Sequence, residues 1–145
     1  MDTASELSRL LGPLRRAVMR ASRSAAGLPD LPEAQIELLR ALAAEGPLSP
    51  RTVAQRLRIA PSTVSNLVKT MVAAGLVSRD PDPGDLRAVV LTPSAAALDL
   101  LDRYDRTSSA ALAHAIDQLP AGERDTLAAS LPILAELVTA LEQSG

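Results

Sequence analysis

Apolar residues recur every three or four positions along most of the chain, which is the period of an α-helix. In the first such segment, residues 5–26, leucines and Val18 share one face while arginines occupy the others. Gly27 and Pro29 follow, and both residue types favour the end of a helix. The pattern therefore predicts an amphipathic helix over residues 5–26.

A second helix is predicted to begin near Asp30 and to stop at Gly46. Asp30 is a good capping residue, Glu33 lies three positions later, and Pro32 suits the first turn of a helix. Its buried face is expected to carry the apolar side chains at helical spacing, which are Ile36, Leu39, Leu42 and Ala43.

Two shorter helices follow, and each is opened by a proline. Ser49 is a preferred capping residue and predicts a helix over residues 50–57. The next helix is predicted over residues 61–74, with Gly75 closing it. Ala60 stands at its cap position, so this helix lacks a side-chain cap that is worth about 1 kcal/mol.

The period of the pattern then falls to two. The runs "LVSR" (76–79) and "AVVLT" (88–92) are rich in β-branched residues and flank a loop of Pro, Gly and Asp. Such runs on either side of a turn are typical of a β-hairpin. Asp82, followed by Pro83 and Gly84, suits the tip of that hairpin.

The last third of the chain is predicted to form two helices. Thr92 and Pro93 are expected to cap a helix reaching about Gln118, whose spine is Leu98, Leu101, Ser108, Leu112, Ala115 and Leu119. In the final helix the apolar spacing alternates between four and three, as in helices that pair with others. These residues are Leu127, Leu131, Leu134, Val138 and Leu141. Pro132 lies among them and is expected to bend the helix.

Composition narrows the class of protein. The chain has 145 residues, 47% of them hydrophobic, but no Phe or Trp, so a core must be built from Leu, Val and Ala. This composition favours helix, and the length suits one domain. The chain has no cysteine, which excludes disulfides, thiolate metal sites and thiol redox chemistry. No signal peptide or long apolar run is visible, so we expect a cytoplasmic protein.

Charge is distributed unevenly along the chain. Residues 47–92 carry five Arg and Lys69 against three Asp, whereas residues 93–145 carry three Arg against eight acidic residues. A basic middle and an acidic end fit an anion-binding centre attached to a solubilising, interacting segment.

The two shorter helices have the layout of a helix-turn-helix. The apolar residues expected to pack them together are Val53, Ala54 and Leu57 on the first and Val64, Leu67, Val68 and Met71 on the second. The other face of the second helix carries hydrogen-bonding side chains and no acid, as a helix in the DNA major groove requires. An ordinary helical hairpin with a polar face is the alternative. The β-hairpin that follows favours a winged helix instead.

The stretch 62–92 resembles the recognition helix and wing of MarR-family transcriptional regulators. The motifs that carry the resemblance are Gly75-Leu76-Val77-Ser78-Arg79, Asp85-Leu86-Arg87 and Leu91-Thr92. The order of the six helices matches as well, so the resemblance covers essentially the whole chain. The wing has fewer basic residues than is common in the family.

The resemblance implies a mainly α fold with a small β-hairpin and one MarR-like domain over residues 1–145. Residues 31–92 would form the winged-helix DNA-binding lobe, and residues 1–30 and 93–145 the dimerisation helices. The expected protein is a homodimer that binds a pseudo-palindromic operator in double-stranded DNA. It is expected to act as a repressor that a small ligand releases, with no other cofactor, no metal and no membrane association.

The polar face of the second helix, together with the wing motifs of the resemblance, indicates which residues contact DNA. They are Ser62, Thr63, Ser65, Asn66, Lys69, Thr70, Arg79, Asp85 and Arg87. Arg87 is expected to reach into the minor groove, where narrow A·T-rich sequence concentrates negative potential. Asp85 is expected to hold the Arg87 guanidinium in place, and Asp80 to face solvent.

A few other residues invite a chemical interpretation. Tyr104 is expected either to line a ligand pocket or to be buried with a hydrogen bond, and His114 to have a surface or packing role. Asp99, Asp102 and Asp105 are expected to form a solvated stripe. No Ser-His-Asp arrangement or Gly-rich phosphate loop is visible in the sequence, so we do not expect an enzyme.

Two other classes of function stay open at this point. The sparse basicity of the wing and the acidic pI also fit a winged helix that binds proteins, which would not be retained on heparin or random-sequence DNA at low salt. A small-molecule-binding protein without DNA function would show a ligand shift in melting temperature and no DNA binding.

Overall fold

The structure is a computed structural model that describes residues 2–145, apart from the side chains of residues 24–26. Its elements follow in the order α1 (Thr3–Ala26), α2 (Glu33–Glu45), α3 (Pro50–Leu57), α4 (Pro61–Ala73), β1 (Val77–Asp82), β2 (Asp85–Pro93), α5 (Ala95–Asp117) and α6 (Ala121–Ser144). This confirms the predicted mainly α fold with one β-hairpin. Among the described residues, no helix is long and apolar enough to cross a membrane.

Several helix ends follow the predicted capping chemistry. Gly27 adopts the left-handed conformation at the end of α1, where its φ of 60° favours glycine. The Ser49 hydroxyl accepts a hydrogen bond from the Thr52 amide at 3.1 Å and so caps α3. Ala60 precedes α4 without a side-chain hydrogen bond, as expected.

Two predicted caps are wrong. Asp30 does not cap α2, because its carboxylate accepts from the Arg23 guanidinium at 2.7 Å, and Pro32 occupies the cap position. The cap of α5 is Ser94, whose hydroxyl accepts from the Ala97 amide at 3.0 Å. Residues 92–93 cannot serve there because they still pair with β1.

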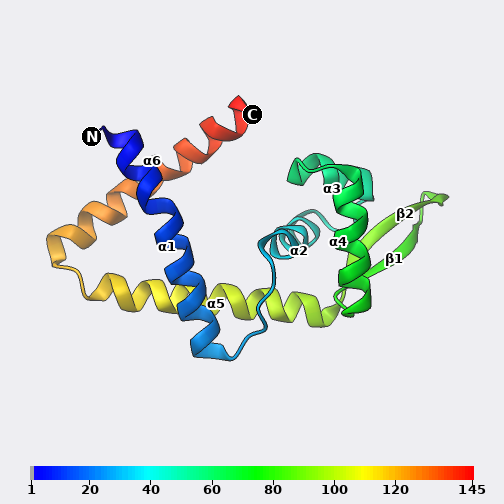
Figure 1. The fold of residues 1–145 in the computed structure, drawn as a ribbon, viewed down its shortest axis with the longest axis horizontal. Coiled ribbons are helices and arrows are strands. Elements are labelled where there is room, and N and C mark those ends of the chain that lie inside the picture. The colour runs from blue at the N-terminus through cyan, green and yellow to red at the C-terminus, as the bar shows by residue number, and fades with distance from the viewer. Residues whose placement is uncertain (1) are drawn as a thin grey trace.

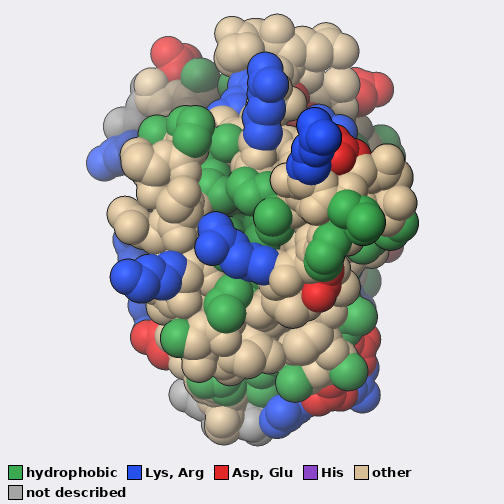
Figure 2. Space-filling model, turned by 90° about the vertical axis from the view of Figure 1, so that its right-hand side faces the viewer, with side chains coloured by type: hydrophobic (Ala, Val, Ile, Leu, Met, Phe, Trp, Pro, Cys, Tyr) green, Lys and Arg blue, Asp and Glu red, His purple; other side chains and the backbone are tan. Residues whose placement is uncertain are grey.

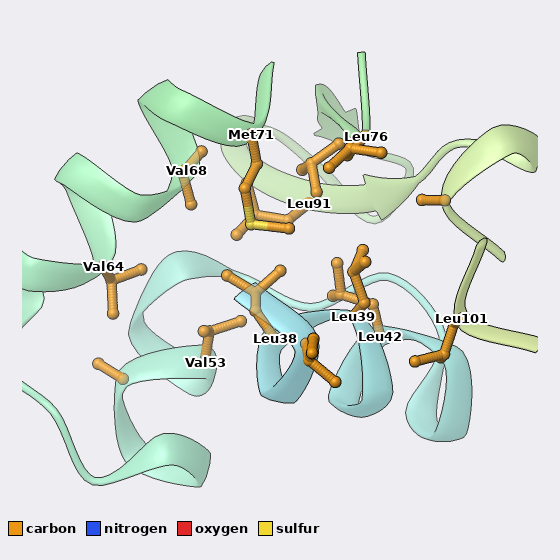
Figure 3. Packing of buried hydrophobic residues seen from close by; sticks show 14 residues of the cluster. Leu38, Leu39, Leu42, Val53, Val64, Val68, Met71, Leu76, Leu91 and Leu101 are labelled. Carbon is orange, nitrogen blue, oxygen red and sulfur yellow. The ribbon is translucent and has the colours of Figure 1, made fainter. Parts of the chain in front are cut away.

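The core lies inside the lobe formed by α2, α3, α4 and the hairpin. Figure 3 shows side chains from these elements meeting between α2 below and α4 above. The fully buried ones are Leu38, Leu39, Leu42, Val53, Val64, Val68, Met71 and Leu91. The helix-turn-helix packing predicted from the sequence is therefore confirmed. On α2, however, Ala43 is exposed, so its predicted burial is wrong. Leu38, which was not predicted, is buried instead.

The hairpin is attached to the lobe by a further backbone pairing. Leu91 on β2 exchanges both of its backbone hydrogen bonds with Leu48, at 2.7 and 3.3 Å. Leu48 lies in the connection before α3 and was not predicted to join the sheet. Because Leu91 is also fully buried, the base of the hairpin is fixed against the core while the tip extends away from it (Figure 1).

The long helices extend from the lobe on its other side. Figure 1 shows α5 running from the lobe past α1, and α6 turning back above it. Where α1 crosses α5, the hydroxyls of Ser22 and Ser108 lie 3.0 Å apart, and Ser22 is fully buried. At its far end, α6 accepts a hydrogen bond at the Glu142 carbonyl from Arg58, at 2.5 Å.

The predicted spine of α5 needs correction. Its buried residues are Ala97, Leu101 and Tyr104, whereas Leu98, Leu112 and Leu119 are exposed. The predicted aspartate stripe is only partly solvated. Asp105 accepts two hydrogen bonds from Arg40, at 2.6 and 3.1 Å, and so joins α5 to α2.

A second ion pair joins α2 to α3. The Arg56 guanidinium donates to the Glu45 carboxylate at 2.9 and 3.0 Å. This hydrogen bond lowers the pKa of Glu45 and raises that of Arg56, because each charge stabilises the other. Both groups face solvent, so the pair orients the helices more than it stabilises them.

Candidate nucleic-acid interface

The outward face of α4 consists of the residues predicted to contact DNA. Val64, Val68 and Met71 are buried in the core, and this fixes the rotation of the helix about its axis. The residues left on the opposite face are all exposed, and they are Ser62, Thr63, Ser65, Asn66, Lys69 and Thr70. The structure therefore brings these six predicted residues together on one surface.

The hydrogen bonds of this face show which groups are available to a ligand. The hydroxyls of Ser65 and Thr70 donate to the carbonyls of Pro61 and Asn66 within α4, both at 3.2 Å. Their oxygens retain acceptor capacity, since a hydroxyl has two lone pairs. In the part of the chain that the structure describes, the side chains of Asn66 and Lys69 make no hydrogen bond.

The wing contributes a cation beside this face. Arg79 on β1 lines a surface groove of about 390 Å³ together with Ser65, Asn66, Lys69 and Val72 of α4. The lining of this groove therefore contains two positive side chains and two uncharged polar ones. Val72 was not predicted to lie at this groove. It is half-exposed although its neighbours Val68 and Met71 are buried, and the sequence alone does not show this difference.

The tip of the wing is built from two consecutive side-chain turns. The Asp82 carboxylate accepts from the Gly84 amide at 2.9 Å, which confirms the predicted turn chemistry. Asp85 accepts from the Arg87 amide at 3.1 Å. The expected brace is therefore wrong for this structure, because Asp85 holds the backbone of Arg87 and not its guanidinium. Within residues 2–145, the exposed Arg87 guanidinium makes no ion pair.

Asp80 also differs from its expected role. It is half-buried, and its carboxylate accepts a hydrogen bond from the Ser78 hydroxyl at 2.8 Å. The three wing aspartates thus each bond to a neighbouring donor. Figure 2 shows the side of the molecule with α3, α4 and the hairpin, where Lys and Arg side chains stand among uncharged polar and hydrophobic ones.

Comparisons with known proteins agree with this geometry. A sequence model described as MarR family matches residues 27–88. A helix-turn-helix transcriptional regulator of Mycobacterium tuberculosis is 31% identical over 134 residues, which cover 90% of this chain and 94% of that protein. The chain belongs to the MarR family.

Solved structures of MarR-type regulators share the whole fold. A transcriptional regulator from Thermotoga maritima is 25% identical, with a TM-score of 0.64 over 97% of this chain and 96% of that one. A variant of MepR from S. aureus, solved with a bound oligodeoxyribonucleotide, is 20% identical, with a TM-score of 0.67 over 97% and 99% of the two chains. MarR-family proteins are DNA-binding transcriptional regulators and not enzymes, so membership confirms that expectation for this chain.

A second candidate site of this MarR-family chain lies where the lobe meets the long helices. Tyr104 is only 3% exposed, and its hydroxyl accepts from the Leu31 amide at 3.5 Å, so the expectation of a buried, hydrogen-bonded Tyr is confirmed. Beside it is a cavity of about 260 Å³, lined by Arg15, Met19, Glu33, Ile36, Glu37, Arg40, Tyr104 and Ser108. Tyr104 thus also lines a cavity, and the binding of a ligand there stays a prediction.

His114 lies away from both of these sites. It is exposed, and its Nε2 is 3.1 Å from the side-chain nitrogen of Gln118, one helical turn further on. This agrees with the expected surface role. No group of three or more His, Asp or Glu residues with metal-binding geometry occurs among the residues that the structure describes.

Proposed function

We propose that this MarR-family protein is a sequence-specific transcriptional repressor that places α4 in the DNA major groove. The observation that carries the proposal is the outward face of α4, whose polar residues are exposed, include no acid and share a groove with Arg79. A duplex offers phosphates at the edges of the groove and base edges at its centre, and this face offers matching donors.

The groups on the interface suit different parts of the duplex. Lys69 on α4 and Arg79 on β1 line the same groove, and as cations they are suited to contacting phosphates. Asn66, which lines the same groove, is suited to reading base edges, since its amide can bond adenine in two places. Arg87 at the wing is directed to the adjacent minor groove, where its unpaired guanidinium meets the strongest negative potential.

The exposed apolar surface of the long helices supports a homodimer. No described residue of α6 is buried, even though the helix carries many apolar side chains. More than half of the surface is exposed for each of Leu131, Ile133, Val138 and Leu141. Leu10 and Leu14 on α1 are exposed as well. A second copy of the chain would cover these faces, and two lobes would then read two half-sites of a pseudo-palindromic operator.

The cavity beside Tyr104 supports release by a small ligand. It lies between the lobe and the helices proposed to form the dimer. A bound molecule would therefore change the position of the lobe relative to those helices. The lining of the cavity includes the Tyr104 hydroxyl together with Arg15 and Arg40, which are paired with Glu33 and Asp105. A ligand that carries acceptor groups would compete with these carboxylates for the two arginines. The regulator would act in the cytoplasm on double-stranded DNA, and it would need no other cofactor.

The proposal is tested by selecting bound duplexes from a random pool with the full chain. We expect a two-fold symmetric sequence to be enriched, and its affinity to fall steeply with salt because Lys and Arg contacts release counterions. Arg87→Ala should weaken binding to the selected duplex at least about tenfold, since one bidentate or groove contact is worth ~1–3 kcal/mol.

Arg103→Ala is the matched control for this measurement, because it removes an exposed arginine from α5, away from α4 and the wing. It should leave the affinity unchanged in the same gel-shift titration. If no duplex is enriched and the protein is not retained on heparin at low salt, the proposal fails and a protein-binding winged helix is favoured.

A further inference from the structure

A leucine at the wing tip is exposed to an unusual degree. Leu86 is 79% exposed, the highest value among the large hydrophobic residues that the structure describes. It follows Asp85 at the start of β2 and precedes Arg87. A leucine in this position adds little to the stability of the fold, because it buries almost no apolar area.

Two side-chain hydrogen bonds constrain the backbone of the tip that carries Leu86. The hydrogen bond from the Arg87 amide to the Asp85 carboxylate closes a ring around Leu86. The preceding turn is closed by the Asp82 carboxylate and the Gly84 amide, and the proline between them has a restricted φ. Leu86 is therefore presented by a preorganised structure, and little ordering entropy is lost when it binds a surface.

Both acidic side chains of the tip are engaged with backbone amides. Asp82 and Asp85 each accept an amide hydrogen bond within the tip. The groups that project without a partner in residues 2–145 are the Leu86 side chain and the Arg87 guanidinium. A surface that takes both must offer apolar contact beside negative charge.

The minor groove of DNA offers this combination. Its walls are deoxyribose rings with apolar C–H groups, and the phosphates lie along both rims. Leu86 and Arg87 lie between the paired residues Asp85 and Val89, where the register of the hairpin shifts, so the tip can present both side chains to a groove that receives it. Apolar side chains are used in this way by other minor-groove binders.

We propose that Leu86 is a minor-groove contact that packs against deoxyribose and selects against guanine at the base pair it faces. This inference rests on the proposed DNA-binding function. Guanine places a 2-amino group in the minor groove that A·T pairs lack. A leucine side chain cannot accept a hydrogen bond from the 2-amino group, and it would clash with that group in the groove.

The first test compares Leu86→Ala with Val89→Ala on a duplex selected by the wild-type protein. Val89 lies further along the same strand and is 41% exposed, so it controls for loss of apolar surface on the wing. Leu86→Ala should weaken binding about tenfold, the scale of losing one buried leucine contact. Val89→Ala and Leu86→Met should stay close to wild type.

The salt dependence separates this contact from an electrostatic one. Leu86→Ala should leave the slope of log affinity against log salt unchanged, because an apolar contact releases no counterion. Arg87→Ala should reduce the magnitude of that slope by about one. A change of slope for Leu86→Ala would contradict the proposed contact.

The last test locates the contact in the minor groove. At each pair flanking the major-groove site, G·C is compared with inosine·C, which lacks only the minor-groove amino group. At one position in each half-site, wild type should bind inosine·C about tenfold more tightly than G·C, as a lost contact of this size implies. Leu86→Ala should bind the two duplexes equally.

The outcomes distinguish the inference from the function on which it rests. If the wild-type chain selects no duplex, the proposed function itself fails. If it selects one and Leu86→Ala binds that duplex as tightly as wild type, DNA recognition stands and the role of Leu86 is overturned. A melting temperature equal to that of wild type would show that the variant is folded, as expected for so exposed a residue.

Discussion

At the scale of single residues, Asp85 shows why a motif does not determine a contact. A carboxylate two positions before an arginine can reach either the guanidinium or the backbone amide of that arginine. The sequence is the same in both cases. In the structure the Asp85 carboxylate accepts from the Arg87 amide, which the tight turn after Gly84 brings within 3.1 Å of it.

Two substitutions separate these roles. Asp85→Asn keeps an oxygen that can accept from the Arg87 amide but removes a negative charge near DNA, so affinity for the selected duplex should rise modestly, by about threefold or less. Asp85→Ala removes the turn hydrogen bond and should loosen the tip, which lowers the affinity relative to Asp85→Asn. Equal weakening by both variants, measured by gel shift, would favour a brace on the guanidinium instead.

The interface residues on α4 were predictable because the fixed period of a helix determines which residues lie opposite the buried ones. Once Val64, Val68 and Met71 are assigned to the core, the exposed face of α4 follows. That these exposed residues contact DNA stays a prediction. Val72 and the exposure of Leu86 were not foreseen, since each depends on how closely neighbouring elements approach.

At the scale of elements, α3 and α4 differ in one capping hydroxyl. Ser49 caps α3 through the Thr52 amide, whereas Ala60 leaves the start of α4 without a side-chain bond. Ala60→Ser should therefore stabilise the protein against unfolding by about 1 kcal/mol, and Ser49→Ala should destabilise it by about the same amount. Urea unfolding followed by circular dichroism measures both changes.

The control for these variants is Ser62→Ala, which removes a hydroxyl from the first turn of α4 that caps nothing in the described residues. It should change the free energy of unfolding far less than Ser49→Ala. An Ala60→Ser variant that is no more stable than wild type would mean that the start of α4 is already satisfied by solvent.

The α5 helix shows the limit of periodicity as a predictor. Its apolar residues fall on more than one stripe, and the spacing alone cannot say which stripe meets the rest of the chain. The stripe with Ala97, Leu101 and Tyr104 is buried because α1 and α2 pack there. Leu98, Leu112 and Leu119, which were predicted as the spine, remain at least one-third exposed in a single chain.

At the scale of the whole molecule, the lobe and the long helices are stabilised differently. The lobe has its own core, whereas α6 is joined to the rest by little more than the hydrogen bond from Arg58. This 24-residue helix has no buried side chain, so it lacks the packing of an apolar face from which most helices in proteins gain their stability. The sequence predicted the spacing of that face, but it could not say that no residue among those described would cover it.

A charge placed on this face should therefore separate the subunits. Val138 is 54% exposed on α6, and Val138→Asp would place a carboxylate in the middle of the proposed interface, where an unpaired buried charge is strongly unfavourable. We expect wild type to have the mass of two chains by light scattering and Val138→Asp the mass of one. Gln143→Glu, near the end of α6, adds a negative charge at the margin and should remain dimeric.

The same variant tests the link between assembly and DNA binding. Two lobes joined in a dimer bind adjacent half-sites with an effective concentration that a monomer lacks, which raises affinity by about 10²–10⁴ without any new contact. Val138→Asp should therefore lose at least about a hundredfold in affinity for a two-half-site duplex, yet bind a single half-site as weakly as wild type does. A monomeric variant that binds the full duplex as tightly as wild type would show that one winged helix suffices, and the proposed operator symmetry would then have no basis in the protein.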